Sequence, residues 1–328
     1  MRPLLARSAK ADPPQSGRNS RARKGSKPGL DIAFVNNMPE AAFRATERQF
    51  AGLVRAAAGR TPVRLHLFSM ADPGQNGLAE GYAPCRSMLG RSFDAAIVTG
   101  REPRAPRLDQ EPYWRDLAEI VDWAKGHTRS TIFSCLAAHA AVLHLDGIER
   151  RRLPEKLSGV FDCAVAGAHP LLDGSGGRVL TPHSRLNALV ERDLASRGYT
   201  VLTRSEEAGV DAFILERDSL FVFLQGHPEY DTDTLLREYR RDVGRFLKGE
   251  RDDYPREPDH YFSEEANAVL RAFRRRALAN RREDLIEVFP NIATPFAIAN
   301  RWNAGAARFY RNWLGELLAR KARAQAMV

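Results

Sequence analysis

The chain has 328 residues, of which 43% are hydrophobic and 28% charged, and its formal net charge is +9. It is long enough to bury a sizeable core, and no run reaches the about eighteen apolar residues that a membrane span requires. Its three cysteines, Cys85, Cys135 and Cys163, are too few for a disulfide or zinc scaffold. Because the N-terminus also lacks an apolar secretory signal, we expect a cytoplasmic protein without membrane contact.

The positive charge is concentrated near the N-terminus. Residues 1–29 hold eight basic residues against one acid, Asp12, and therefore carry +7 of the net charge. This segment is rich in Pro, Ser and Gly and poor in apolar residues, which predicts a disordered basic tail. Such a tail could touch RNA or an acidic surface weakly. A solvated tail is the favoured interpretation, and nucleic acid is not the expected partner.

Strands and helices alternate through the first half of the ordered region, which we expect to begin at residue 30. The predicted strands are residues 30–35, 63–68, 93–98 and 130–134, and the predicted helices are 41–58, 113–125 and 136–145, with a Gly-rich loop over 73–91. This alternation predicts an α/β fold, a doubly wound and mostly parallel sheet with helices on both faces. Sites in such sheets form at the carboxyl ends of the strands, where Asn36, Gly100 and Cys135 would lie.

More strands are predicted in the second half, over residues 156–161, 177–180, 199–203, 211–215 and 220–224. The last two form a hairpin, and Pro182-His183-Ser184-Arg185 is predicted as a turn before a helix at 188–197. A further helix is expected over 232–248. The predicted organisation is a domain of residues 30–258 and a helical C-terminal extension, residues 259–328, packed on the same domain through Trp302 and Trp313.

Cys135 follows an apolar strand and begins a helix of small residues. A sharp strand-to-helix turn lifts its central residue above the sheet and points the first N–H groups of the helix toward whatever that residue attacks. Cys135 is therefore a candidate nucleophile. A buried structural cysteine is the alternative, because free cysteine is among the most buried residue types.

His227 is the histidine best placed to serve such a nucleophile. It follows the apolar run 220–224 and precedes Pro228, which restricts the turn. Glu229 is close enough in sequence to orient the imidazole ring. Cys135, His227 and Glu229 could thus act as nucleophile, base and orienting carboxylate.

Three other histidines have simpler interpretations. His139 and His144 lie on the predicted helix after Cys135 and are interpreted as residues that pack inward. His183 lies in the Pro-His-Ser-Arg segment, where it could equally belong to a turn held by side-chain hydrogen bonds.

Eight motifs occur in the order seen in homoserine O-succinyltransferases. They are Asn36-Asn37-Met38-Pro39 with Thr46-Glu47 and Gln49, Thr99-Gly100, Tyr113-Trp114, the stretch around Cys135, residues 156–161, Pro182-His183-Ser184-Arg185, residues 205–209 and residues 226–231. The chain resembles this family from about residue 30 to Trp313. The resemblance implies a class I glutamine-amidotransferase-like fold.

The resemblance also implies roles for individual residues. Cys135 would take an acyl group from acyl-CoA, His227 would be the base, and Glu229 its partner. The positions that hold the amino-acid substrate in the family are Lys156, Ser184 and Arg241. Arg241 can grip a carboxylate with two nitrogens, and Ser184 can bond a polar group, whereas Lys156 could act near the oxyanion or on the acyl-CoA side. Surface ion pairs remain the alternative for Lys156 and Arg241.

The implied reaction is acylation of the hydroxyl of L-homoserine, a step of methionine biosynthesis. It uses acyl-CoA, either succinyl-CoA or acetyl-CoA, as co-substrate and needs no metal and no tightly bound cofactor. The backbone N–H of Leu136 is the natural first oxyanion donor. The family resemblance further implies a homodimer.

Two departures from the family pattern lie near the expected site. Residues 135–139 are Cys-Leu-Ala-Ala-His where the family has Cys-Trp-Gly-Ala-Gln, so His139 replaces an amide. The loop that separates acyl donors in the family contains Arg101 and Arg104 here. Either arginine could pair with the distal carboxylate of a succinyl group, which favours succinyl over acetyl.

Three alternatives stay open. Serine or another hydroxy-amino acid could replace homoserine, since one methylene separates them and binding alone discriminates it by about 1–3 kcal/mol. A glutaminase could use the same Cys, His and Glu, although glycines usually flank its cysteine. A non-catalytic binding protein could have kept the fold, but the retained Cys135, His227 and Glu229 speak against it.

Overall fold

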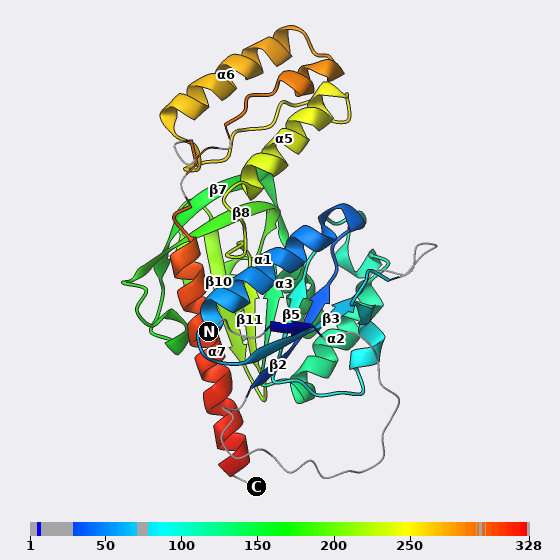
Figure 1. Ribbon diagram of the computed structural model, residues 1–328, viewed down its shortest axis with the longest axis vertical. Helices are drawn as coiled ribbons and strands as arrows, with labels where there is room; N and C mark the ends of the chain where they lie inside the picture. The colour runs from blue at the N-terminus through cyan, green and yellow to red at the C-terminus, as the bar shows by residue number, and fades with distance from the viewer. Residues whose placement is uncertain are drawn as a thin grey trace.

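The computed structural model describes residues 5–7, 29–70, 78–292, 294, 297–298 and 300–326 (Figure 1). Most of the expected basic tail and the start of the expected Gly-rich loop lie outside these residues. Within the tail segment, β1 (Leu5–Arg7) pairs in parallel with β3 (Val63–Ser69). Among the described helices, none is both long enough and apolar enough to cross a membrane.

One half of the sheet is parallel, with the strand order β1-β3-β2-β5-β6-β11. Its strands are β2 (Leu30–Asn36), β3, β5 (Ala95–Thr99), β6 (Ser130–Ser134) and β11 (Leu220–Leu224), and the short β4 (Ala83–Pro84) pairs with β3. The helices that follow β2, β5 and β6 are α1 (Glu40–Ala58), α2 (Trp114–His127) and α3 (Leu136–Asp146). The predicted doubly wound α/β arrangement is confirmed.

The sheet continues in antiparallel order from β11 through β10, β9, β7 and β8. These elements are β7 (Arg151–Val165), β8 (Arg178–Ala188), β9 (Thr200–Ser205) and β10 (Gly209–Glu216), with the short α4 (Glu191–Ala195) before β9. The predicted hairpin of β10 and β11 is confirmed.

The turn predicted at Pro182-His183-Ser184-Arg185 is wrong, because these residues lie inside β8. His183 pairs with Gly159 and Ser184 with Ser158 of β7. β8 is the last strand in the sheet order, and an edge strand tolerates the missing N–H of Pro182. Alternate residues of β8 therefore face opposite sides of the sheet.

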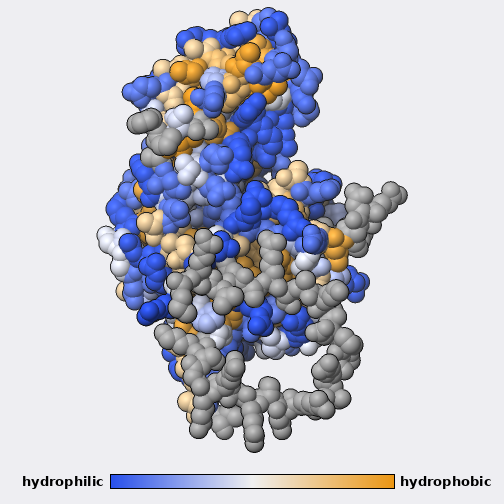
Figure 2. All heavy atoms as spheres, viewed as in Figure 1, coloured by the Kyte–Doolittle hydropathy of each residue, from blue (hydrophilic) through white to orange (hydrophobic). Residues whose placement is uncertain are grey.

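The C-terminal region packs in two different places. α5 (Thr234–Leu247), α6 (Glu264–Ala279) and Trp302 share a hydrophobic cluster at one end of the molecule, at the top of Figure 1. α7 (Asn303–Ala326), with Trp313, instead packs with α1 on the sheet. Residue 259 is thus no packing boundary, since α5 and α6 lie on either side of it. Figure 2 shows hydrophobic residues reaching the surface over the α5–α6 end.

Short 3-10 helices complete the described chain. They are η1 (Cys85–Met88), η2 (Leu108–Gln110), η3 (Pro170–Leu172) and η4 (Glu283–Val288). η3 packs beside α7, and η4 packs beside α5. Through these contacts, η3 and η4 are held against helices of the C-terminal part of the chain.

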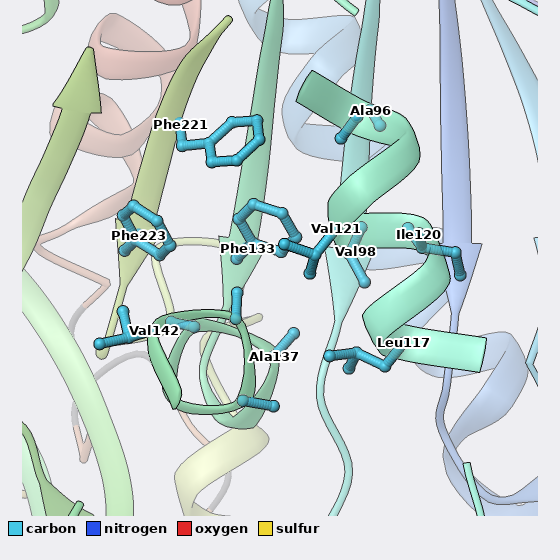
Figure 3. Packing of buried hydrophobic residues seen from close by; sticks show 14 of the residues in the cluster. Ala96, Val98, Leu117, Ile120, Val121, Phe133, Ala137, Val142, Phe221 and Phe223 are labelled. Atoms are coloured by element: carbon cyan, nitrogen blue, oxygen red, sulfur yellow. The ribbon is translucent and has the colours of Figure 1, made fainter. Parts of the chain in front are cut away.

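The parallel strands are buried on both faces, as expected for central strands. Successive residues of β6 show this, because Phe133 belongs to the cluster under α2 and α3 and Ile132 to the cluster under α1 and α7. Figure 3 shows Phe133 beside Phe221 and Phe223 of β11. The rings of Phe133 and Phe223 stack with centroids 5.5 Å apart. This packing holds β6 and β11 side by side, so that the residues following them meet.

Candidate active site

A cavity of about 2010 Å³ opens at the carboxyl ends of the parallel strands. Gly100 follows β5, Cys135 follows β6 and His227 comes shortly after β11, and all three line the cavity. Residues of β7, β8 and α5 also line the cavity. The sequence-based expectation that Gly100 and Cys135 lie along this edge is confirmed.

Cys135 occupies a strained turn between β6 and α3. Its backbone has φ 53° and ψ −117°, a conformation that costs a non-glycine residue on the order of 1–3 kcal/mol. Its N–H donates to the carbonyl of Leu224 at 2.7 Å, which fixes the turn to β11. Cys85 and Cys163 are buried, whereas Cys135 is only half-buried and borders the cavity. Cys135 therefore has the access that a nucleophile needs.

His227 and Glu229 form a hydrogen-bonded pair beside Cys135. Nδ1 of His227 lies 2.8 Å from Oε1 of Glu229. Because an ionised carboxylate only accepts, this contact places the ring proton on Nδ1. Burial alone would lower the pKa of His227, but the negative charges of Cys135 and Glu229 and hydrogen bonds to both raise it well above 6.5. The structure thus brings the three predicted catalytic residues together.

Gly100 permits a close approach between the loop after β5 and the start of α3. A Cβ atom at this position would lie 2.6 Å from the backbone N of Leu136 and 2.8 Å from that of Ala137. The first N–H groups of a helix have no partner one turn earlier. The N–H of Leu136, next to Cys135 in the cavity wall, is therefore placed to stabilise an oxyanion formed at the nucleophile.

The three residues predicted to bind the amino-acid substrate surround two carboxylates of α5. Lys156 of β7 donates to Oδ2 of Asp242 at 2.8 Å and lies 3.5 Å from Oε2 of Glu238. Ser184 of β8 donates to Glu238. Nε and Nη2 of Arg241 each lie 3.2 Å from Oδ1 of Asp242. A cluster of alternating charges thus lines the same cavity as Cys135.

Glu238 and Tyr230 are site residues that sequence reasoning missed. The Tyr230 ring stacks on His227 with centroids 4.2 Å apart, and its hydroxyl donates to Oε1 of Glu238 at 2.7 Å. Burial would raise the pKa of Glu238, but Lys156 and the Ser184 and Tyr230 hydroxyls lower it overall. Glu238 is therefore ionised. Helical spacing is the sequence signal that could have identified Glu238. Glu238 lies one turn before Arg241, so the two side chains share a face of the helix.

His183, left ambiguous by the sequence, lies in a buried network beneath the His227 turn. Its Nδ1 accepts from Nε of Arg185 at 3.2 Å, and its Nε2 lies 3.2 Å from Oδ1 of Asp211. These three and Cys163 are buried, and Cys163, His183 and Asp211 have ligand atoms within 4.8 Å of one another. Nε2 of His183 is buried and makes no hydrogen bond of acceptable geometry within the described residues, so Asp211 approaches the ring without a well-formed hydrogen bond. Gly226, next to His227 in the turn, packs directly against this network. A Cβ atom added at Gly226 would lie only 2.7 Å from Oδ1 of Asp211, so the network fixes the position of the turn.

The two arginines expected to determine acyl specificity both line the cavity. The Arg101 guanidinium lies over the Tyr113 ring, 5.7 Å from its centroid. Arg104 is exposed, and its backbone N–H donates to Oε1 of the buried Glu111 at 2.6 Å. Glu111 thereby holds the loop, while the Arg104 side chain extends at the cavity rim.

Comparisons with known proteins agree with the motifs. The family model described as homoserine O-succinyltransferase matches residues 15–323. The homoserine O-succinyltransferase of Rhodopseudomonas palustris is 49% identical over 290 residues, which cover 87% of this chain and 87% of that protein. The one of Bradyrhizobium japonicum is 49% identical over 294 residues, which cover 88% and 90%. A solved glutamine amidotransferase from Methylobacillus flagellatus aligns with 88% of this chain and 94% of its own, at 15% identity and a TM-score of 0.49.

Proposed function

Because this chain belongs to the homoserine O-succinyltransferase family, we propose that it transfers a succinyl group from succinyl-CoA to the hydroxyl of L-homoserine. One observation carries the proposal. A strained Cys135 at the floor of a large cavity faces His227, which Glu229 orients at 2.8 Å. Such an arrangement supports covalent acyl transfer in two steps.

In the first step, the Cys135 thiolate attacks the thioester carbon of succinyl-CoA. The carbonyl oxygen becomes an oxyanion beside the N–H of Leu136. The carbon–sulfur bond to CoA then breaks, and protonated His227 gives its proton to the leaving thiolate. The products are free CoA, a succinyl thioester on Cys135 and neutral His227.

In the second step, neutral His227 takes the proton of the homoserine hydroxyl as its oxygen attacks the acyl-enzyme carbonyl. The thioester bond breaks, O-succinylhomoserine leaves, and Cys135 returns to the thiolate with His227 protonated. The charge balance of the pair is restored, and no metal or bound cofactor is required by these steps. Glu229 holds the ring in the same orientation throughout.

The charged cluster of β7, β8 and α5 fits the charged groups of an amino acid. Arg241 is half-exposed at the cavity and can bind an α-carboxylate. Ionised Glu238 can accept from an α-ammonium group, and Tyr230 keeps Glu238 near the catalytic ring. We expect an acceptor bound in this way to direct its side-chain hydroxyl toward His227. Lys156 neutralises the remaining acid, Asp242.

Intact-mass measurement tests the first step directly. Incubation with succinyl-CoA should add one succinyl group to the protein, and homoserine should then remove it. Cys135→Ala should show no adduct, whereas Cys85→Ala, at a buried cysteine outside the cavity, should behave as wild type. An adduct that persists in Cys135→Ala would overturn the proposal.

An assay matrix separates the remaining alternatives. Succinyl-CoA and acetyl-CoA are each combined with homoserine and with serine, and glutamine is tested for ammonia release. The proposal expects the largest kcat/KM for succinyl-CoA with homoserine. Serine as the better acceptor, or ammonia release from glutamine, would contradict it. The homodimer implied by the resemblance stays a prediction, which sedimentation equilibrium can check.

A further inference from the structure

Beyond Leu136, the wall of the cavity formed by α3 and the loop that follows it has no role in the steps above. His139 lies one helical turn after Cys135, and Arg150 follows the end of α3; both line the cavity. His139 is only 4% exposed. Within the described part of the chain, Nδ1 of His139 and Nη1 of Arg150 are buried without a hydrogen-bond partner. Buried polar atoms without partners are costly and rare.

We propose that Arg150 is the residue that binds the distal carboxylate of the succinyl group while the acyl chain is attached to Cys135. The inference rests on the proposed acyltransfer function and names its donor-specificity residue. A guanidinium can bind a carboxylate with two parallel hydrogen bonds. The carboxylate of a succinyl thioester lies three carbon–carbon bonds from the carbonyl carbon, so its partner must stand close to the nucleophile.

Two other arginines that line the cavity already have partners. Arg185 donates to His183 and to the carbonyls of Asn187 and Ala208. Arg241 is paired with Asp242 and is proposed above to bind the α-carboxylate of the acceptor. Arg150 differs, because one of its terminal nitrogens is buried and has no hydrogen-bond partner within the described residues.

The surroundings of Arg150 leave its charge available. The Glu111 carboxylate attracts the Arg150 guanidinium. However, Oε1 of Glu111 already accepts hydrogen bonds from the backbone N–H groups of Arg104 and Ala105. Burial lowers the pKa of His139 to about 3, so this ring is neutral and neither repels Arg150 nor competes for an anion. Arg150 and Cys135 line the same cavity, and their charges interact.

The expected role differs from that of the loop arginines. Arg104 is exposed at the rim, where water weakens a charge pair. An ion pair formed at the half-buried Arg150 is screened less. Acetyl-CoA has no distal carboxylate, so Arg150 should contribute to reaction with succinyl-CoA and not to reaction with acetyl-CoA.

The test compares acyl-enzyme formation from the two donors in single-turnover reactions, followed by intact mass. Arg150→Met should slow succinylation of Cys135 about 10- to 100-fold, the loss expected for charged hydrogen bonds. Acetylation should change by less than about threefold. Arg150→Lys should recover part of the succinylation rate. Arg151→Met is the matched control, because Arg151 is exposed and pairs with Asp193 outside the cavity.

Each outcome supports or overturns the inference. Equal loss with both donors, or no loss with either, would overturn it while leaving acyltransfer intact. A wild-type protein that accepts acetyl-CoA and rejects succinyl-CoA would also overturn it. If wild type takes neither donor, the proposed function fails first. Should Arg150→Met not fold, the donor preference of Arg150→Lys decides, because the inference requires a lower succinyl-to-acetyl ratio than in wild type.

Discussion

Replacing Gly100 with alanine should disable the nucleophile turn without unfolding the protein. The added Cβ would stand 2.6 Å from the backbone N of Leu136, about 0.8 Å short of the 3.4 Å at which ordinary contact begins. Because the obstacle is backbone, the loop or the start of α3 must move by nearly that distance. A displacement on the order of 1 Å can cost a hundredfold in rate, and a lost oxyanion donor costs about 10²–10³ in kcat.

We therefore expect Gly100→Ala to lower the rate of acyl-enzyme formation at Cys135 by about 10²- to 10³-fold, measured by stopped-flow CoA release. Overpacking should cost only about 1–3 kcal/mol of unfolding free energy, measured by urea denaturation. Gly52→Ala is the matched control, because its Cβ would meet nothing within 4 Å. A folded Gly100→Ala variant with acylation within threefold of wild type would refute the reasoning.

Three further changes probe the acceptor wall, the catalytic pair and the core. Glu238→Gln should raise the KM for homoserine about 10- to 100-fold in steady-state assays; equal slowing of acyl-enzyme formation would contradict an acceptor role. Cys135→Ala should lower the pKa of His227 in an NMR titration, because the Cys135 charge helps to raise it. A raised folded-state pKa stabilises the protein fully below the unfolded pKa of about 6.5, and this contribution is lost as pH rises through the folded pKa. The contribution should therefore be smaller in Cys135→Ala and its loss complete at lower pH, and an unchanged titration would count against the pair. Phe133→Ala removes a fully buried ring and should lower the free energy of unfolding, measured by urea denaturation, by about 3–5 kcal/mol. A loss below about 1 kcal/mol would contradict this prediction and show that the surrounding core collapses into the space left by the ring.

Local patterns were sufficient to predict the parallel half of the sheet. Alternation of apolar strands with amphipathic helices requires parallel neighbours, and the carboxyl ends of parallel strands share one edge. Cys135 and His227 could therefore be placed together before the structure was known. The Pro182-His183-Ser184-Arg185 segment was mispredicted because proline and serine favour turns locally, whereas pairing with β7 keeps the segment extended.

The amino-acid sequence by itself determined the fold class and the meeting of Cys135 with His227, since each depends on residues close together in the chain or on strand ends that must meet. Only the tertiary structure decided the charged cluster around Glu238 and Asp242 and left a buried nitrogen of Arg150 without a partner within the described residues. Glu238 meets Ser184 across 54 positions of sequence, and Lys156 meets Asp242 across 86. Such contacts depend on how α5, β7 and β8 pack around one cavity, and no local periodicity encodes which charge remains without a partner.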